Sequence, residues 1–381
     1  MGIRTFREAI LVLAGFGALS GPLFAQSGAA KSVPAEQSAT NSWKFAVSGD
    51  SRNCGDVVMP AIAAGVKKSG ARFYWHLGDL RAIYDFDEDI VHELEHLSKP
   101  LPISDYEALA WNDFIKHQIE PFGGTPFFLG IGNHETISPK TREQFIIQFT
   151  DWLDSSVLQA QRLADDPNDR RLRTYYHWIV PPVDFVYLDN ATPDQFDDDQ
   201  IKWFEKVLSA AKSNPQIRTV VVGMHEALPE SISADHSMNQ SAAGIESGRR
   251  VYTDLLRLQN ENQKRVYILS SHSHYFMEGI FNTDYWRVYG GILPGWIVGT
   301  AGAQRYKLPE ARAEARVAKN NIYGFLVGAV KPDGEIEFNF HEVSVSDVSK
   351  ETAAQFGRKP GETEDFVPWC FDHNTQDPKK D

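Results

Sequence analysis

Five short segments of this 381-residue chain carry side chains that bind metal ions or transfer protons. They supply Asp50, Asp79, Asn133, His134, Glu135, His225, His272 and His274. Carboxylate oxygens, an amide carbonyl and neutral imidazoles form a donor set that suits zinc, manganese or iron. A carboxylate can bridge two such ions, and two ions about 4 Å apart can hold the attacking and leaving oxygens of a phosphoryl transfer. The pattern therefore predicts a metal centre suited to phosphate chemistry.

Each of these segments ends a short apolar run that is typical of a buried strand. Such runs lie in residues 44–50, 71–79, 126–135, 184–190, 218–226 and 265–274. Helical patterns separate several of them, for instance in residues 199–213. Repeated strand–helix–strand units predict a layered α/β architecture, in which ligands gather beyond the carboxyl ends of the strands. The candidate metal-binding residues fall at those ends.

The last third of the chain has a different pattern. Residues 295–303, 323–334 and 335–345 look like an antiparallel set that closes the core, with a Pro-Asp-Gly turn between the last two. After Val345 the chain is polar, apart from an apolar clump at residues 366–371 that could hold the tail on the domain. The two cysteines, Cys54 and Cys370, lack zinc-binding spacing, so a disulfide and two buried thiols both remain open.

The N-terminal residues 1–25 have the pattern of a signal peptide. Arg4 and Arg7 precede an apolar run, and a cleavage point follows Ala25. The run is shorter than the roughly 20 residues that span a bilayer, so cleavage is expected and an uncleaved anchor is the alternative. Residues 26–42 are small and polar, as in a flexible linker. We therefore predict a periplasmic or secreted protein without stable membrane insertion.

In their order, the motifs resemble those of the calcineurin-like metallophosphoesterases, the superfamily that includes the purple acid phosphatases. The family's D-x-H, GD, GNH-E/D, H and GH-x-H correspond here to GDSR, GD, GNHE, MHE and SHSH. The resemblance extends over residues 43–346. It implies one catalytic domain, a four-layer α/β/β/α sandwich of two mixed β-sheets flanked by helices. Residues 347–381 would form a tail packed on that domain.

The resemblance also implies a role for each candidate residue. Two metal ions are expected, with Asp79 bridging them, Asn133, His225 and His272 completing one site, and Asp50 and His274 serving the other. His134 would be the acid or charge stabiliser beside the leaving oxygen, and Glu135 would orient it. Both residues are therefore expected to be catalytic, and His134 would also contact the substrate.

These roles imply an exported metal-dependent phosphoesterase that hydrolyses phosphomonoesters by attack of metal-bound water or hydroxide on phosphorus. A phosphodiesterase using the same site and a non-catalytic metal- or phosphate-binding protein are the alternatives. The net charge of -13 argues against nucleic acid or an anionic membrane as a partner. A small phosphate ester remains compatible with it, because a bound metal can reverse the local field.

Arg52 departs from the family pattern, because the first motif normally ends in a metal-binding histidine. An arginine has no lone pair to give to a metal and stays protonated, so the first metal site loses a ligand and is expected to be weak. Strand alternation past Asp50 would aim Arg52 at the metal cluster, where its fork could bind phosphate oxygens. The alternatives are an ion pair with a carboxylate such as Asp56, or a side chain that turns away.

Two further departures are smaller. Ser271 replaces the glycine before His272, which asks only for an ordinary backbone angle at that position. The tyrosine that purple acid phosphatases use as an iron ligand would fall at Ala82, and Tyr84 is two residues too late. The charge-transfer iron site of that subgroup is therefore not expected.

The sequence HELEH at residues 92–96 matches the H-E-x-x-H pattern of zinc proteases. The apolar residues of this segment cluster on one side of a helix, and His92 and His96 point nearly opposite. We therefore expect both histidines on a solvated helix face rather than beneath a cleft.

Overall fold

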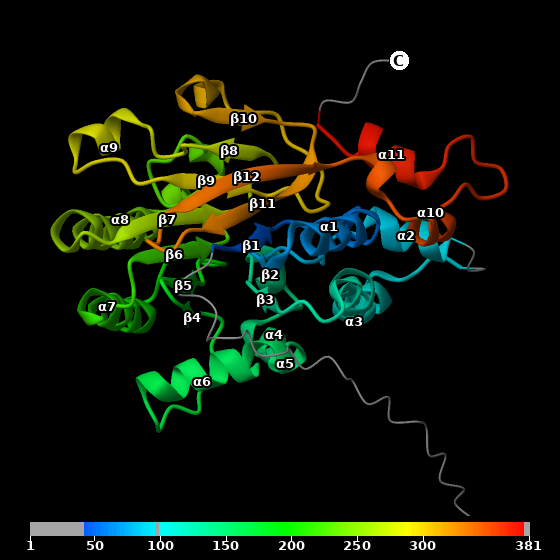
Figure 1. The fold of residues 1–381 in the computed structure, drawn as a ribbon. Coiled ribbons are helices and arrows are strands. Elements are labelled where there is room, and N and C mark those ends of the chain that lie inside the picture. The colour runs from blue at the N-terminus through cyan, green and yellow to red at the C-terminus, as the bar shows by residue number, and fades with distance from the viewer. Residues whose placement is uncertain (1–41, 96–98, 377–381) are drawn as a thin grey trace, which may run out of the picture.

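The computed structural model describes residues 42–95 and 99–376, and two mixed β-sheets form its centre (Figure 1). Within these residues, one sheet has the order β12-β11-β1-β2-β3 and the other the order β10-β8-β9-β7-β6-β5-β4. The strands of the first are β1 Trp43–Ser48, β2 Ala71–His76, β3 Phe127–Leu129, β11 Tyr323–Val330 and β12 Ile336–Val343. Those of the second are β4 Tyr176–Val180, β5 Val183–Leu188, β6 Thr219–Met224, β7 Arg265–Ser270, β8 Phe276–Glu278, β9 Gly295–Val298 and β10 Val317–Lys319.

Helices cover the outer faces of both sheets (Figure 1). Helix α1 (Gly55–Ser69) packs on β2, β11 and β12. On the other sheet, Phe204 of α7 (Asp198–Ser213), Leu255 of α8 (Ala242–Asn262) and Val222 of β6 share one apolar cluster. The other α-helices described are α2 Glu88–Leu94, α3 Ile103–Phe114, α4 Arg142–Gln148, α5 Thr150–Leu153, α6 Ser156–Asp165, α9 Asp284–Val288, α10 Lys350–Gln355 and α11 Phe366–Asp372. The predicted four-layer sandwich is confirmed.

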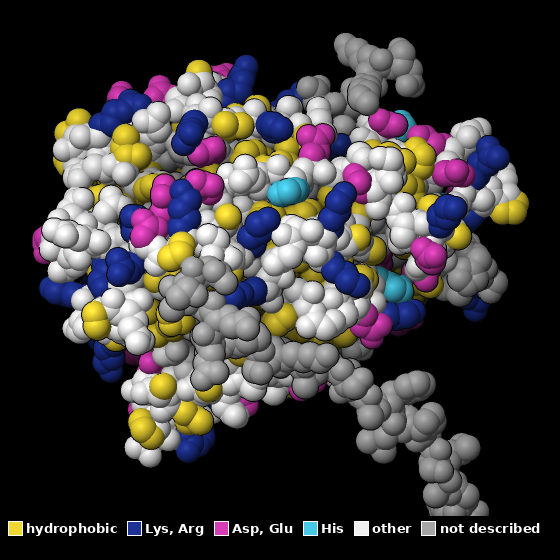
Figure 2. All heavy atoms as spheres, in the orientation of Figure 1, with side chains coloured by type: hydrophobic (Ala, Val, Ile, Leu, Met, Phe, Trp, Pro, Cys, Tyr) yellow, Lys and Arg dark blue, Asp and Glu magenta, His cyan; other side chains and the backbone are white. Residues whose placement is uncertain are grey.

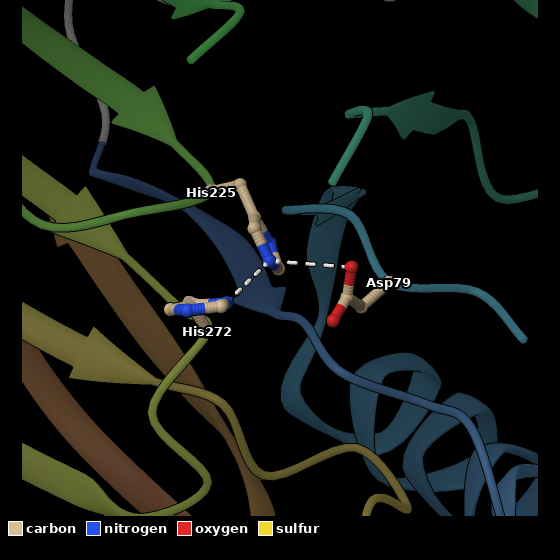
Figure 3. Close-up of side chains that lie close together, drawn as sticks. All are labelled: Asp79, His225 and His272. Atoms are coloured by element: carbon tan, nitrogen blue, oxygen red, sulfur yellow. Dashed lines mark hydrogen bonds and ion pairs between the residues drawn. The ribbon is translucent and has the colours of Figure 1, made fainter. Parts of the chain in front are cut away.

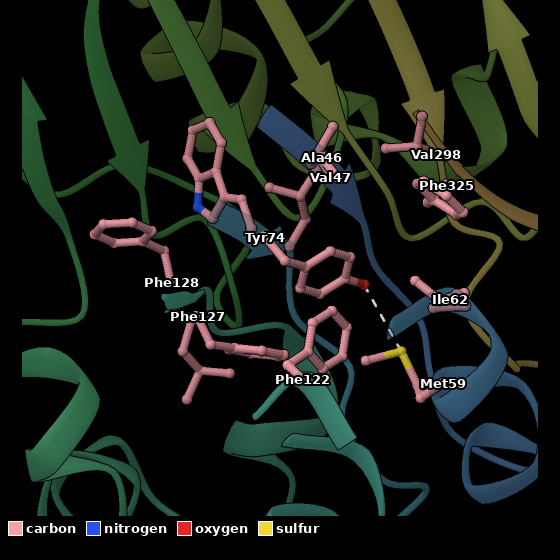
Figure 4. Close-up of a cluster of buried hydrophobic side chains, with 14 of the residues drawn as sticks. Ala46, Val47, Met59, Ile62, Tyr74, Phe122, Phe127, Phe128, Val298 and Phe325 are labelled. Carbon is pink, nitrogen blue, oxygen red and sulfur yellow. Dashed lines mark hydrogen bonds between the residues drawn. The ribbon is translucent and has the colours of Figure 1, made fainter. Parts of the chain in front are cut away.

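Strand β2 shows how the core holds the strand that leads to Asp79. Its side chains alternate between the two faces of the sheet. Phe73 and Trp75 face the second sheet, with ring centroids 5.2 Å and 6.1 Å from that of Phe185. Tyr74 points the other way, and its hydroxyl lies 3.7 Å from the Met59 sulfur of α1 (Figure 4). Packing on both faces therefore fixes the carboxyl end of β2.

The last third of the chain matches its predicted pattern in part. Strands β11 and β12 are antiparallel and joined at the predicted turn, and β11 also pairs antiparallel with β1. The segment after Gly295 was expected in the same set but forms β9 of the other sheet, parallel to β7 and antiparallel to β8. All four residues of β9 are buried. A run that is apolar on both faces fits the interior of either sheet, so the sequence pattern of β9 did not identify the sheet to which it belongs.

The C-terminal tail is fastened to the loop that follows β1. Cys54 and Cys370 form a disulfide with their Cα atoms 6.0 Å apart, which decides between the two alternatives left open by the sequence. Phe366 and Val367 of α11 are buried against the domain. The tail thus reaches a position two residues from Arg52.

His92 does not lie on a solvated helix face, so that prediction is wrong. Its exposed fraction is 7%, and its ring centroid lies 4.4 Å from that of Phe366. Its Nδ1 is 3.7 Å from a carboxylate oxygen of Glu362. The helical pattern accounted for the apolar side of α2 alone, whereas the tail covers the other side. His96 lies outside the described residues.

The predicted signal peptide and residues 26–41 of the linker also lie outside the described part of the chain. None of the helices in the described ranges 42–95 and 99–376 is long and apolar enough to span a bilayer.

Candidate metal centre

The candidate residues come together beyond the carboxyl ends of β1, β2, β3, β6 and β7. Asp50, Asp79 and His272 have φ angles of 60°, 59° and 65°, a conformation that is costly for residues other than glycine and that concentrates at functional sites. The Asp50 N–H donates to the Gly78 carbonyl at 3.0 Å. The His272 N–H donates to Asp50 Oδ2 at 2.8 Å. These contacts hold turns from separate strands in one place.

Four of the candidates form what we call the four-donor group: Asp79, Asn133, His225 and His272. His225 Nε2 is its centre and lies 3.2 Å from Asp79 Oδ1. It also lies 3.0 Å from Asn133 Oδ1 and 3.0 Å from His272 Nδ1. Figure 3 shows His225 directed at both Asp79 and His272. One ring nitrogen therefore faces three other donor atoms at hydrogen-bond distance.

The protonation of His225 shows that the four-donor group fits a metal ion better than a proton. His225 Nδ1 lies 3.0 Å from the Leu77 carbonyl oxygen, which can only accept, so Nδ1 carries the proton. In the neutral ring, the lone pair of Nε2 then faces Asp79, Asn133 and His272. Burial opposes a second proton, but Asp79 raises the pKa of His225 to about 10. That proton could be directed at one of the three neighbours, whereas a metal ion accepts lone pairs from all four, so the group fits an ion.

Three further candidates form the arginine group, Asp50, Arg52 and His274, beside the second oxygen of Asp79. Arg52 Nη2 lies 3.3 Å from His274 Nε2, and Arg52 Nε lies 3.8 Å from Asp79 Oδ2. Asp50 Oδ1 lies 3.4 Å from His274 Nε2. The guanidinium thus lies among the donors of the expected first metal site. The alternative partner Asp56 is paired with Arg81 instead.

His134 lies at the edge of the cluster and is held by the main chain. Its Nδ1 donates to the Ala82 carbonyl at 2.7 Å, and its Nε2 lies 3.6 Å from Asp79 Oδ2. Burial lowers the pKa of His134. Glu135 does something other than orient this ring: it accepts the N–H groups of Asp79, Leu80 and Gly132 at 2.7–2.9 Å. It therefore ties the loop of Asp79 to the loop of His134, and Ala82 performs the expected orienting role.

Two residues near the cluster were missed from the sequence. The ring of Tyr306 stacks on His274 with centroids 3.9 Å apart, and its hydroxyl lies 3.4 Å from Arg52 Nη2. The ring of His236 lies 5.6 Å from His272 and 5.2 Å from Tyr306. Tyr306 lies in a loop and His236 ends the short 3-10 helix Ala234–His236, and strand-end patterning gives no signal in either place. His236 alone was detectable, as a histidine in the segment that follows His225.

Comparison with known proteins supports the fold. No protein-family model matches the chain, and no curated protein matches it either. The structure of PhoD overlaps with a TM-score of 0.54 at 13% identity, covering 83% of this chain and 74% of PhoD. A purple acid phosphatase from yellow lupin seeds overlaps with a TM-score of 0.47 at 15% identity, covering 80% of this chain and 52% of the lupin chain. GAP50, the anchor in the inner membrane complex of Plasmodium, overlaps with a TM-score of 0.47 at 14% identity, covering 79% of this chain and 84% of the GAP50 chain.

The overlap with PhoD carries this comparison, because the other two TM-scores are below 0.5. The chain therefore shares the fold of PhoD over most of its length, in line with the metallophosphoesterase-like fold that its motifs predicted. The identities are too low to transfer an activity, so the function must be argued from the site.

Proposed function

We propose that the protein is an exported metal-dependent phosphoesterase that hydrolyses phosphomonoesters. The observation that carries the proposal is the four-donor group, in which lone pairs of four side chains converge on one place. A zinc, manganese or iron ion would be held by Asp79, Asn133, His225 and His272. It would supply Lewis-acid charge to the phosphate and lower the pKa of the attacking water.

The neighbouring residues would bind the ester and move its proton. His134 Nε2 is the ring nitrogen that Ala82 leaves free, so the ring, once protonated there, can give that proton to the leaving oxygen. Arg52 has N–H groups beyond those near His274 and Asp79, and these can bind phosphate oxygens. Glu135 would act indirectly, by keeping the loops of Asp79 and His134 in register.

Export and a small substrate complete the proposal. A disulfide between Cys54 and Cys370 supports an oxidising compartment, in line with the signal-peptide pattern. On the face in Figure 2, Lys and Arg side chains are interspersed with Asp and Glu rather than gathered in a basic patch. Together with the net charge of -13, this face supports a small phosphate ester, rather than nucleic acid, as the partner.

The test is turnover of p-nitrophenyl phosphate and its bis-ester by purified protein, before chelation, after chelation, and after each ion is restored. We expect monoester hydrolysis that chelation removes and an added ion restores. Faster turnover of the bis-ester would favour the phosphodiesterase alternative. Bound metal without turnover of either ester would contradict an enzymatic role and favour a binding protein.

A further inference from the structure

The arginine group is filled by a cation of the chain itself. The Arg52 side chain is 12% exposed, and its guanidinium lies 3.3 Å from His274 Nε2 and 3.8 Å from Asp79 Oδ2. The donor atoms of Asp50, Asp79 and His274 all lie within 4.8 Å of one another. These three residues are the protein ligands that remain for a first metal ion. The guanidinium therefore competes with that ion for the same surroundings.

His274 shows the competition at a single atom. Its Nδ1 lies 2.6 Å from the Gln304 carbonyl oxygen, so Nδ1 carries the proton and Nε2 keeps one lone pair. Arg52 Nη2 is a donor 3.3 Å from that nitrogen. Tyr306 stacks on the His274 ring and places its hydroxyl 3.4 Å from the same Nη2. One lone pair cannot serve both a guanidinium and a metal ion.

The electrostatics act in the same direction. Arginine remains protonated under all ordinary conditions. A divalent ion between Asp50, Asp79 and His274 would lie beside this fixed positive charge in a buried place, where repulsion is weakly screened. The four-donor group has the opposite character, because its four described donors face one another with no arginine or lysine between them.

From this contrast we infer that the centre holds one metal ion, in the four-donor group, and that the Arg52 guanidinium takes the place of the other ion. The inference deepens the proposed function and rests on its metal dependence. It differs from the sequence-based expectation in the number of ions. The substrate phosphate would be held between one ion and a guanidinium, which supplies charge and N–H donors in place of coordination bonds.

The experiment measures bound metal per chain and the magnetic state of bound manganese. Wild-type protein is reconstituted with Mn²⁺, passed through a desalting column, and examined by elemental analysis and electron paramagnetic resonance. We expect one equivalent and the spectrum of an isolated ion. Arg52→His offers an imidazole in place of the guanidinium, and we expect it to bind two equivalents with a spin-coupled spectrum. Arg218→His, at an exposed arginine before β6, is the matched control and should bind one equivalent.

Each outcome has a clear meaning. Two equivalents and a coupled spectrum in the wild type would overturn the inference, whereas the proposed function would stand. One equivalent in both the wild type and a folded Arg52→His variant would overturn the role given to Arg52. No bound manganese, zinc or iron in the wild type, together with no ester turnover, would overturn the proposed function itself. The metal content of the wild type tests the one-ion centre by itself, so the inference can still be contradicted if the Arg52→His variant does not fold.

Discussion

Two arginines, the partly buried Arg52 and the fully buried Arg81, occupy equivalent positions in the chain and have opposite surroundings. Arg52 comes two residues after Asp50, and Arg81 comes two residues after Asp79, beyond the parallel neighbours β1 and β2. The two aspartates have nearly the same φ, 60° and 59°. Arg81 is enclosed by an acidic cage formed by Asp56, Asp87, Asp89 and Asp113. The nearest carboxylate in an ion pair with Arg52 is Asp79, at 3.8 Å.

The surroundings indicate that the charge of Arg81 stabilises the fold, whereas the charge of Arg52 is available to a ligand. Arg81 Nη1 donates to Asp89 Oδ1 at 3.0 Å, and Nη2 pairs with both Asp56 and Asp113. Its positive charge is more than balanced within the cage. Among the described residues, Arg52 has no such enclosure, and its charge lies beside the candidate metal-binding side chains His274 and Asp79, where the proposed phosphate would bind. Arg52 and Arg81 thus share the same position after a strand, but the side chains of the neighbouring loops determine what each arginine does.

The largest difference is expected between the two aspartates that precede these arginines. Asp79→Asn should abolish ester hydrolysis and bound metal, because Asp79 Oδ1 belongs to the four-donor group. Asp50→Asn should retain one equivalent of metal, since Asp50 lies in the arginine group. Turnover assays with elemental analysis check both variants. Loss of all metal from Asp50→Asn, or near-normal turnover in Asp79→Asn, would break the distinction between the two groups.

The two arginines should differ next in their effect on stability. Arg81→Met leaves the acidic cage without its buried cation and should lower the free energy of unfolding by about 3–5 kcal/mol. Arg52→Met removes longer contacts and should cost about 1 kcal/mol. Urea unfolding of the metal-free proteins measures both. Equal losses would show that Arg52 is as structural as Arg81.

A smaller loss is expected from the link that fastens the Arg52 loop. Cys54 is two residues from Arg52 and is bonded to Cys370, across a sequence separation of 316. Cys370→Ser should lower the free energy of unfolding by about 2–4 kcal/mol, because the disulfide restricts the unfolded chain. Urea unfolding with and without a reductant provides the measurement, and the reductant should have no further effect on the variant. An unchanged midpoint would show that the tail contributes nothing to holding this loop.

The smallest effect concerns a second cation beside the acidic cage. His117 Nδ1 lies 3.0 Å from Asp113 and 3.3 Å from Asp56. Burial opposes its charge, but these carboxylates raise the pKa of His117 to about 10. The pKa of His117 in the folded protein exceeds the unfolded value of about 6.5. The contribution of charged His117 to the free energy of unfolding is therefore complete below about pH 6.5 and is lost as the pH rises towards 10.

His117→Gln should therefore cost about 1–2 kcal/mol at pH 6 and much less at pH 10. Urea unfolding across this pH range gives the difference between wild type and variant. A difference that does not change with pH would exclude a charged His117.

Much of the fold follows from local patterns, whereas contacts made by distant segments do not. The runs before Asp50 and Asp79 are apolar on both faces, as a buried parallel strand must be. Strands β1 and β2 could therefore be predicted from these local apolar runs. His92 was misplaced because its partner Phe366 lies far along the chain. The place of β9 was missed for a related reason, since burial on both faces does not identify a sheet.

The site shows the same division. Residue types and motif order brought Asp79 and His225 into one prediction, because both end buried strands. They could not tell that Ala82, rather than Glu135, holds the ring of His134. They could not tell that Arg52 lies 3.3 Å from His274 either, since that distance depends on a loop more than two hundred residues away.

The most direct test of the account is anomalous diffraction from crystals of the wild-type protein grown with Mn²⁺ or Zn²⁺, measured at the absorption edge of the ion. We expect one anomalous peak, within bonding distance of Asp79, Asn133, His225 and His272, with the Arg52 guanidinium beside His274. A second peak between Asp50 and His274, with Arg52 displaced, would contradict the one-ion centre. The absence of a peak at the four-donor group would contradict the metal site itself.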